Sequence, residues 1–264
     1  MRKGLLFLLP ALLGAAQPAV KDVTLTTPDG FALKGTLAMP AAKGPRPVVI
    51  LAHQFRADRS GWKVLADELN ARGIATFSLD LRGHGQSTAK GGSTVAVTAD
   101  FKESSQLLGF AEIPADLHLA AIWVRKQPGI DGRRLALAGS SIGGYSVLAG
   151  APAIHPVAVL ALSPAGGWGE KPAERLAAAA AKARSAVYVW ASEDDKDAFA
   201  NATALKPVFG VYARIVPGRE HGFDYLPGNH ELMAGWLAEM LLPRPRAAAP
   251  AKDTAVPQPA EKAK

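Results

Sequence analysis

The residues best suited to chemistry are Gly139-Ser140-Ser141-Ile142-Gly143, which fit the pattern G-x-S-x-G. In this spacing a serine occupies a tight turn between a strand and a helix, and the glycines leave room for its strained backbone. An apolar run, residues 135–138, precedes the pattern, and a helical pattern, residues 142–151, follows it. Ser141 is therefore the candidate nucleophile. Ser140 is the weaker candidate, because it lacks a glycine two residues away on each side.

The elements that must position this serine alternate between short apolar runs and longer helical segments. Strands are expected at residues 23–26, 33–39, 48–52, 74–79, 135–138, 157–162, 187–191 and 211–216, and helices at 61–72, 113–127, 142–151 and 230–242. This alternation predicts an α/β protein, a three-layer α/β/α sandwich whose eight-stranded, mostly parallel sheet has helices on both faces. No large cap domain is expected, since residues 163–186 have an ordinary crossover length; a small cap would fall within residues 85–110.

Two further motifs give the chain a family resemblance. Residues 48–55 read VVILAHQF, a buried strand that ends in His-Gln, and residues 80–87 read DLRGHGQS, which fits D-x-R-G-H-G-x-S. With these motifs in order, residues 23–242 resemble a single-domain α/β hydrolase of the esterase, dienelactone-hydrolase or monoacylglycerol-lipase kind. The resemblance implies the α/β-hydrolase fold. It also implies that His84, within the second motif, shapes a loop beside the site and is structural.

A nucleophilic serine needs a base, and the base needs an acceptor that orients it. The resemblance implies the chain order serine, acid, histidine. His221 is the candidate base because it lies in a loop directly after the last strand, whereas His230 is expected to begin a helix. In the family the acid usually lies three residues after a small residue at a strand end, so the resemblance implies Asp194, three residues after Ala191. Asp195 is the next candidate, ahead of Glu193.

Acyl transfer also requires donors for the developing oxyanion, and backbone amides at a helix start suit that task. The amide of Ile142 is the first candidate, and the resemblance implies that of Phe55 as the second. Gln54 stands where the family has a glycine, which is the main departure from the pattern. If that glycine provides an unusual backbone angle, Gln54 alters the loop without removing the Phe55 amide. Four aromatic residues flank these motifs and could line an acyl site or belong to the core: Phe55, Tyr145, Trp168 and Phe223.

These features predict a serine hydrolase that cleaves a carboxylic ester or thioester, so the expected partner is a small-molecule ester or acyl substrate. Two alternatives stay open, a serine peptidase or amidase of the same fold, and a non-catalytic envelope binding protein that kept the fold. The histidines are scattered without an HExxH pairing, and no G-x-G-x-x-G follows the first buried strand. Neither a metal site nor a cofactor is implied.

The two ends of the chain differ from the body. Residues 1–16 combine a basic start, an apolar run and small residues for cleavage after Ala16, which predicts a signal peptide. After its cleavage we expect no membrane span, and we expect the protein to be periplasmic or secreted. Residues 243–264, rich in Pro, Ala and Lys, predict a disordered tail, which leaves a hydrolase domain at 20–242. The net charge of +7 is concentrated at these ends, and nothing indicates nucleic-acid binding. The absence of cysteine is compatible with an oxidising compartment.

Overall fold

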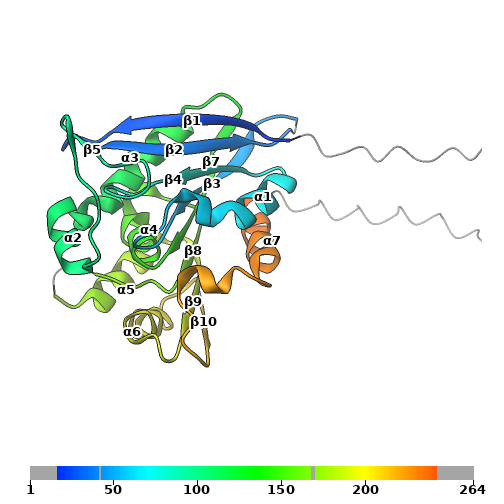
Figure 1. Ribbon diagram of the computed structural model, residues 1–264. Helices are drawn as coiled ribbons and strands as arrows, with labels where there is room; N and C mark the ends of the chain where they lie inside the picture. Colours follow the sequence, from blue (N-terminus) through cyan, green and yellow to red (C-terminus); the bar gives the residue numbers. More distant parts are fainter. Residues whose placement is uncertain (1–16, 42, 168–169, 243–264) are drawn as a thin grey trace, which may run out of the picture.

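A single large sheet organises the protein. The computed structural model describes residues 17–41, 43–167 and 170–242. The eight strands of the sheet lie in the order β1-β2-β4-β3-β7-β8-β9-β10 (Figure 1). Their bounds are β1 Ala19–Thr26, β2 Ala32–Met39, β3 Arg46–Ala52, β4 Ala75–Leu79, β7 Ile130–Ser140, β8 Ala158–Leu162, β9 Ala186–Ser192 and β10 Val211–Val216.

The sheet has an antiparallel edge and a parallel body, and the two parts differ in how they are buried. β1 and β2 form an antiparallel hairpin, and β2 is also antiparallel to β4. From β4 through β3, β7, β8 and β9 to β10, every neighbouring pair is parallel. Strands covered on both faces can be apolar throughout, and β4 and β8 are buried at every residue. Strand β2 instead alternates between buried and partly exposed residues, because one face of this antiparallel edge meets water.

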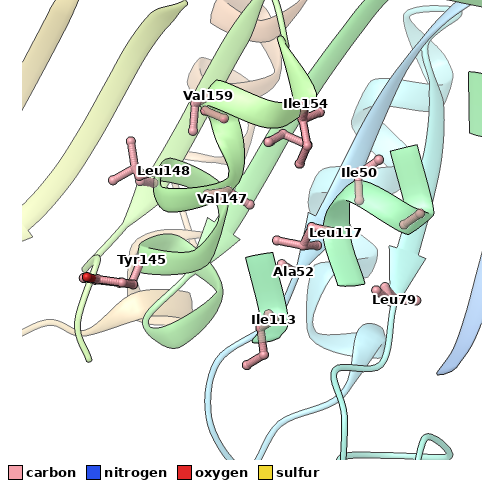
Figure 2. Close-up of a cluster of buried hydrophobic side chains, with 14 of the residues drawn as sticks. Ile50, Ala52, Leu79, Ile113, Leu117, Tyr145, Val147, Leu148, Ile154 and Val159 are labelled. Atoms are coloured by element: carbon pink, nitrogen blue, oxygen red, sulfur yellow. The ribbon is translucent and has the colours of Figure 1, made fainter. Parts of the chain in front are cut away.

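Helices cover both faces of this sheet, as the alternating pattern predicts. Helices α1 (Lys63–Ala71) and α7 (His230–Leu241) pack together on one face, around a core that includes Trp62, Leu160 and Leu237 (Figure 1). The other face carries α3 Ile113–Arg125, α4 Ile142–Ile154, α5 Pro172–Ala183 and α6 Lys196–Leu205. Figure 2 shows part of this second core, where side chains of α3 and α4 lie against β3, β4 and β8. The predicted three-layer α/β/α sandwich is thus confirmed.

The segment considered for a small cap contains a short hairpin and one helix. β5 (Ala89–Lys90) pairs with β6 (Ser93–Thr94), and α2 spans Phe101–Leu108. No helix is predicted here from the sequence, although Asp100 accepts a hydrogen bond from the Glu103 amide at 2.7 Å and so caps α2. An aspartate followed three residues later by a glutamate is a helix-start signal that could have revealed it.

Three 3-10 segments complete the described elements: η1 Arg59–Trp62, η2 Phe110–Glu112 and η3 Gly222–Tyr225. No single helix among the described residues has the length and apolar character to cross a membrane. Helix α2 and the following helical segment, Phe110–Arg125, meet both criteria only when taken as a pair, with a bend of 64° between them. The predicted signal peptide and the predicted tail lie outside the described residues.

Candidate active site

Ser141 occupies the turn between β7 and α4, where the G-x-S-x-G pattern predicts it. Its backbone has φ 54° and ψ −116°, a region that residues with a side chain rarely adopt. The Ser141 amide donates a hydrogen bond to the carbonyl of Leu162 at the end of β8 (2.8 Å), which holds the turn against the sheet. Helix α4 begins at the next residue, Ile142. Strained backbone of this kind needs support from its surroundings, and here the neighbouring strands provide it.

The two glycines of the pattern allow the turn to pack tightly. A Cβ atom at Gly139 would lie 2.2 Å from the carbonyl oxygen of Gly143. A Cβ at Gly143 would lie 2.2 Å from the carbonyl oxygen of Ala52, the last residue of β3. Both contacts are with backbone atoms, which cannot move aside as a flexible side chain can. The spacing of the pattern is therefore a packing requirement between β7, α4 and β3.

His221 lies in the loop between β10 and η3, and its ring is oriented by a carboxylate. Its Nδ1 is 2.7 Å from Oδ2 of Asp195, which directly precedes α6. The Asp195 side chain is 14% exposed and that of His221 is 37% exposed. The carboxylate accepts a hydrogen bond from Nδ1–H, and in this tautomer Nε2 carries a free lone pair. Such a ring is prepared to take a proton from a hydroxyl group.

Asp195, and not Asp194, is the carboxylate that contacts His221, which corrects the choice made from the sequence. Strand β9 continues through Ser192, one residue further than the predicted strand at 187–191. Counting three residues from the true strand end therefore leads to Asp195. The Asp194 side chain is exposed, and its amide donates to the Gly218 carbonyl at 3.0 Å. The predicted strand ended one residue too early.

The loop that carries His221 is held by several hydrogen bonds. The His221 amide donates to Oδ2 of Asp224 (3.0 Å), and the Gly222 amide donates to Oγ of Ser163 at the end of β8 (3.0 Å). The Tyr225 hydroxyl donates to the Glu220 carbonyl at 2.9 Å. Burial raises the pKa of Tyr225 and outweighs hydrogen bonds that lower it, so this hydroxyl stays protonated and able to donate.

The predicted site residues meet in one cavity of about 350 Å³. Ser141, His221, Ile142 and Phe55 all line it. The Ile142 amide is the first of α4, so it has no carbonyl partner within its own helix and lies at the positive end of the helix dipole. The loop after β3 brings Phe55 to the same cavity. The structure therefore places the nucleophile candidate, the base candidate and both oxyanion candidates around one space.

Among the lining residues that the sequence did not indicate are a phenylalanine and an aspartate, and two of the aromatic candidates lie elsewhere. Phe101 of α2 lines the cavity next to Phe55, with ring centroids 5.3 Å apart, and Asp197 of α6 adds a carboxylate. Asp197 belongs to the acidic run 193–197, in which the other three carboxylates were the candidates for the acid that orients His221. Tyr145 is buried and lines a separate hollow beside α5, while the Phe223 ring packs on Trp62. Trp168 lies outside the described residues.

Two other histidines are buried close to these loops. His53 donates from Nδ1 to the Gln54 carbonyl (2.7 Å) and accepts at Nε2 from the Leu81 amide (3.0 Å). His84 is 1% exposed, lies between aromatic rings and donates from Nδ1 to the carbonyl of Arg82. Burial lowers the pKa of each ring to about 4, so both are neutral at pH 7. This is the environment of a structural histidine, as expected for His84.

Three features define an α/β hydrolase: the order of the strands in the sheet, the strained serine between strand and helix, and a histidine at the same cavity that is hydrogen-bonded to a carboxylate. A family model described as "serine aminopeptidase, S33" matches residues 43–210, and the chain belongs to this family. Two uncharacterized proteins of Mycobacterium tuberculosis, from strains CDC 1551 and H37Rv, are each 30% identical over 145 residues. Each match covers 55% of this chain and 45% of the relative, so the chain aligns with less than half of their length.

Solved structures with the same fold include several hydrolases. Acetyl xylan esterase 1 from Thermoanaerobacterium superposes with a TM-score of 0.64 at 19% identity, over 87% of this chain and 86% of the esterase. A dienelactone hydrolase from Anabaena variabilis gives 0.60 at 20% identity, over 85% and 97%. An esterase from Pyrococcus furiosus gives 0.62 at 15% identity, over 85% and 90%. At these identities the similarity establishes the fold, and the α/β-hydrolase resemblance is confirmed.

Proposed function

We propose that this protein is a serine hydrolase that cleaves carboxylic esters or thioesters through an acyl-serine intermediate. The observation that carries the proposal is the convergence of three features on one cavity: the strained Ser141, the His221 ring oriented by Asp195, and the first amide of α4. Each feature has an alternative explanation by itself. Together they supply a nucleophile, a base and an oxyanion donor, which are the groups that acyl transfer requires.

In the first half of the reaction, His221 Nε2 removes the proton from Ser141 Oγ as that oxygen attacks the acyl carbon. Asp195 keeps the imidazole in the correct tautomer and stabilises the imidazolium that forms. The amides of Ile142 and Phe55 donate to the oxyanion, and each such donor contributes about 3 kcal/mol to transition-state stabilisation. When the carbon–oxygen or carbon–sulfur bond breaks, the imidazolium returns the proton to the leaving alcohol or thiol.

In the second half, His221 removes a proton from water as the water oxygen attacks the acyl-serine, and the imidazolium then returns that proton to Ser141 Oγ as the carboxylic acid leaves. The cavity volume of about 350 Å³ lies at the low end for small-molecule sites, and Phe55 and Phe101 form an apolar wall. A short or aromatic acyl group therefore fits better than a long acyl chain. Activity on p-nitrophenyl esters should fall as the acyl chain grows from acetate to decanoate.

The experiment that tests the proposal combines a mechanism-based probe with a substrate. Wild-type protein should react with a fluorophosphonate probe and hydrolyse p-nitrophenyl acetate, and Ser141→Ala should do neither. Ser93→Ala, at an exposed serine of β6, is the matched control and should behave as wild type. Unchanged labelling of Ser141→Ala would eliminate this serine as the nucleophile. A wild-type protein that is never labelled would favour the non-catalytic envelope binding protein.

Peptide or amide cleavage is the second candidate, and the description of the matching family, serine aminopeptidase, favours it. The same three groups serve both reactions, so the leaving group decides between them. Aminoacyl p-nitroanilides measure amide cleavage directly. A kcat/KM for an aminoacyl p-nitroanilide within about tenfold of that for the matching p-nitrophenyl ester would establish the peptidase, because anilides are intrinsically far less reactive.

We also propose that the protein is exported and cleaved after Ala16, which places it in the periplasm or outside the cell. The basic start and apolar run of residues 1–16 support this, and β1 begins at Ala19, three residues after the expected cleavage site. Intact-mass measurement of the protein expressed in a Gram-negative host should give a chain that begins at Gln17. A mature chain that retains Met1 in the cytoplasmic fraction would contradict export.

A further inference from the structure

Gln54 connects the nucleophile turn with the histidine loop through one oxygen atom. Its side chain follows β3, is half-buried and lines the cavity. Its Oε1 accepts one hydrogen bond from Oγ of Ser140, at 2.8 Å, and another from the amide of Phe223, at 2.9 Å. Ser140 directly precedes Ser141, and Phe223 follows His221 by two residues. The two segments that must face each other are thus hydrogen-bonded to the same carbonyl group.

The chemistry of the partners fixes the orientation of this side-chain amide. A backbone N–H can only donate, so the atom facing Phe223 has to be the amide oxygen and not the nitrogen. A carbonyl oxygen has two lone pairs, and here one faces each donor. Any side chain that replaces Gln54 must therefore present an acceptor at the same distance from the backbone to keep both bonds.

The histidine loop packs closely against this connection. A Cβ atom at Gly222 would lie 2.2 Å from Gln54 Oε1 and 2.4 Å from Ser140 Oγ, and the Gly222 φ of +58° also disfavours a side chain. On its other side, the Gly222 amide is bonded to Ser163. The segment directly after His221 is therefore held between the loop after β3, the serine turn and the end of β8.

The Asp195–His221 hydrogen bond orients the imidazole but does not tie the histidine loop to the serine turn, whereas the two hydrogen bonds of Gln54 do. Asp195 fixes the tautomer and rotation of the imidazole, whereas the separation of its Nε2 from Ser141 Oγ depends on where the loop backbone lies. A displacement of about 1 Å in a catalytic group can reduce the rate about 100-fold. The departure from the family pattern at position 54 places no side chain on left-handed backbone there, since the positive φ in this loop is at Arg56, at 59°. A glycine at position 54 has no side chain that could reach either partner.

We propose that Gln54 is a positioning residue, which holds the histidine loop at the distance from the serine turn that proton transfer requires. The inference rests on the proposed serine hydrolase function. It assigns Gln54 no contact with the reacting atoms. The competing explanation is that the two hydrogen bonds only stabilise the fold, in which case their loss should lower stability without changing the rate of each folded molecule.

The test compares two substitutions at this position. Gln54→Met keeps the length and volume of the side chain and removes the acceptor, so kcat for p-nitrophenyl acetate should fall about 30- to 100-fold while KM changes less than about threefold. Gln54→Glu keeps an oxygen that accepts both bonds, so its kcat should exceed that of Gln54→Met at least about tenfold. Rates are divided by the concentration of folded protein measured by near-UV circular dichroism, and thermal midpoints are recorded for each variant.

The matched control is Gln127→Met, at a second half-buried glutamine, whose Nε2 donates to the Trp123 carbonyl far from the cavity. Its kcat should equal that of wild type. The proposal is overturned if Gln54→Met keeps a kcat within twofold of wild type, if its KM rises while kcat is unchanged, or if Gln54→Glu is as slow as Gln54→Met. A wild type that fails to react with the fluorophosphonate probe would instead refute the serine hydrolase function.

Discussion

The two buried histidines, His53 and His84, should make the stability of the protein depend strongly on pH. Burial is the largest cause of the lowered pKa of each ring, and for His84 the nearby His53 lowers it further. The hydrogen bonds of the two rings to the Gln54 and Arg82 carbonyls, and the charges on Asp58 and Asp80, oppose the shift only in part. The folded protein therefore keeps both rings neutral down to a pH of about 4, whereas the unfolded chain protonates them near pH 6.5.

The sign follows from which state binds the protons. Between pH 6.5 and 4 the unfolded chain binds more protons than the folded protein, so the free energy of unfolding falls as the pH falls. The contribution of neutral His53 and His84 is fully present above pH 6.5 and is lost on acidification. For a pKa of about 4 in the fold and 6.5 in the unfolded chain, each histidine costs about 2.5 kcal/mol of stability at pH 4.5. Together they cost about 5 kcal/mol, which is comparable to the whole stability of many domains.

Urea unfolding of wild type and His84→Leu at pH 7.5, 6.5, 5.5 and 4.5 measures this effect. The leucine variant starts from a different stability, but carboxylate titrations should be shared by both proteins and cancel in the comparison. The variant should lose about 2.5 kcal/mol less than wild type between pH 7.5 and 4.5. Parallel curves for the two proteins would refute the reasoning, since they would mean that His84 binds protons equally well in the folded and unfolded states.

Three further outcomes are expected. Asp195→Ala should lower kcat for p-nitrophenyl acetate about 10³- to 10⁴-fold, because the imidazole loses its orienting acceptor. The kcat of Asp194→Ala should stay within about threefold of wild type. Equal losses in the two variants would contradict the assignment of Asp195 as the carboxylate that orients His221. Gly143→Ala should destabilise the protein by about 3 kcal/mol in urea unfolding, whereas Gly235→Ala, on α7 with open space around its Cβ position, should be neutral or stabilising by up to about 1 kcal/mol. Asp197 lines the cavity, and its carboxylate should repel an anionic substrate. Asp197→Asn should therefore raise the ratio of kcat/KM for the p-nitrophenyl monoester of succinate to kcat/KM for the neutral butyrate ester on the order of fivefold. An unchanged ratio would show that substrates bind away from this residue.

The fold could be predicted because its strands are locally distinctive. Residues 48–52 and 158–162 are short apolar runs typical of a covered parallel sheet, and they lie in β3 and β8. The serine turn was equally local, since its glycines, strand and helix are contiguous in the chain. The helix Phe101–Leu108 was missed because its polar residues conceal its periodicity, although Asp100 and Glu103 mark its start.

The parts of the site that could not be predicted depend on the exact end of a strand and on contacts between residues far apart in the sequence. The choice of Asp194 in place of Asp195 came from one residue at the end of β9, since Ser192 still pairs with Val216 in the sheet. The partners of Gln54 lie 86 and 169 residues away along the chain. No local pattern relates such positions, so the sequence showed only that Gln54 was unusual and could not show what it contacts.

The hydrogen bond between Gln54 and Phe223 also sets when the site can exist during synthesis of the chain. A ribosome adds about 5 to 20 residues per second, so Gln54 waits on the order of ten to thirty seconds before Phe223 is made. Until then Ser141 can have its strand and helix but lacks the loop that carries the base. The proposed esterase activity should therefore appear only after the last third of the chain has been added and folded onto the sheet. In a refolding experiment it would be a late signal, after the recovery of secondary structure.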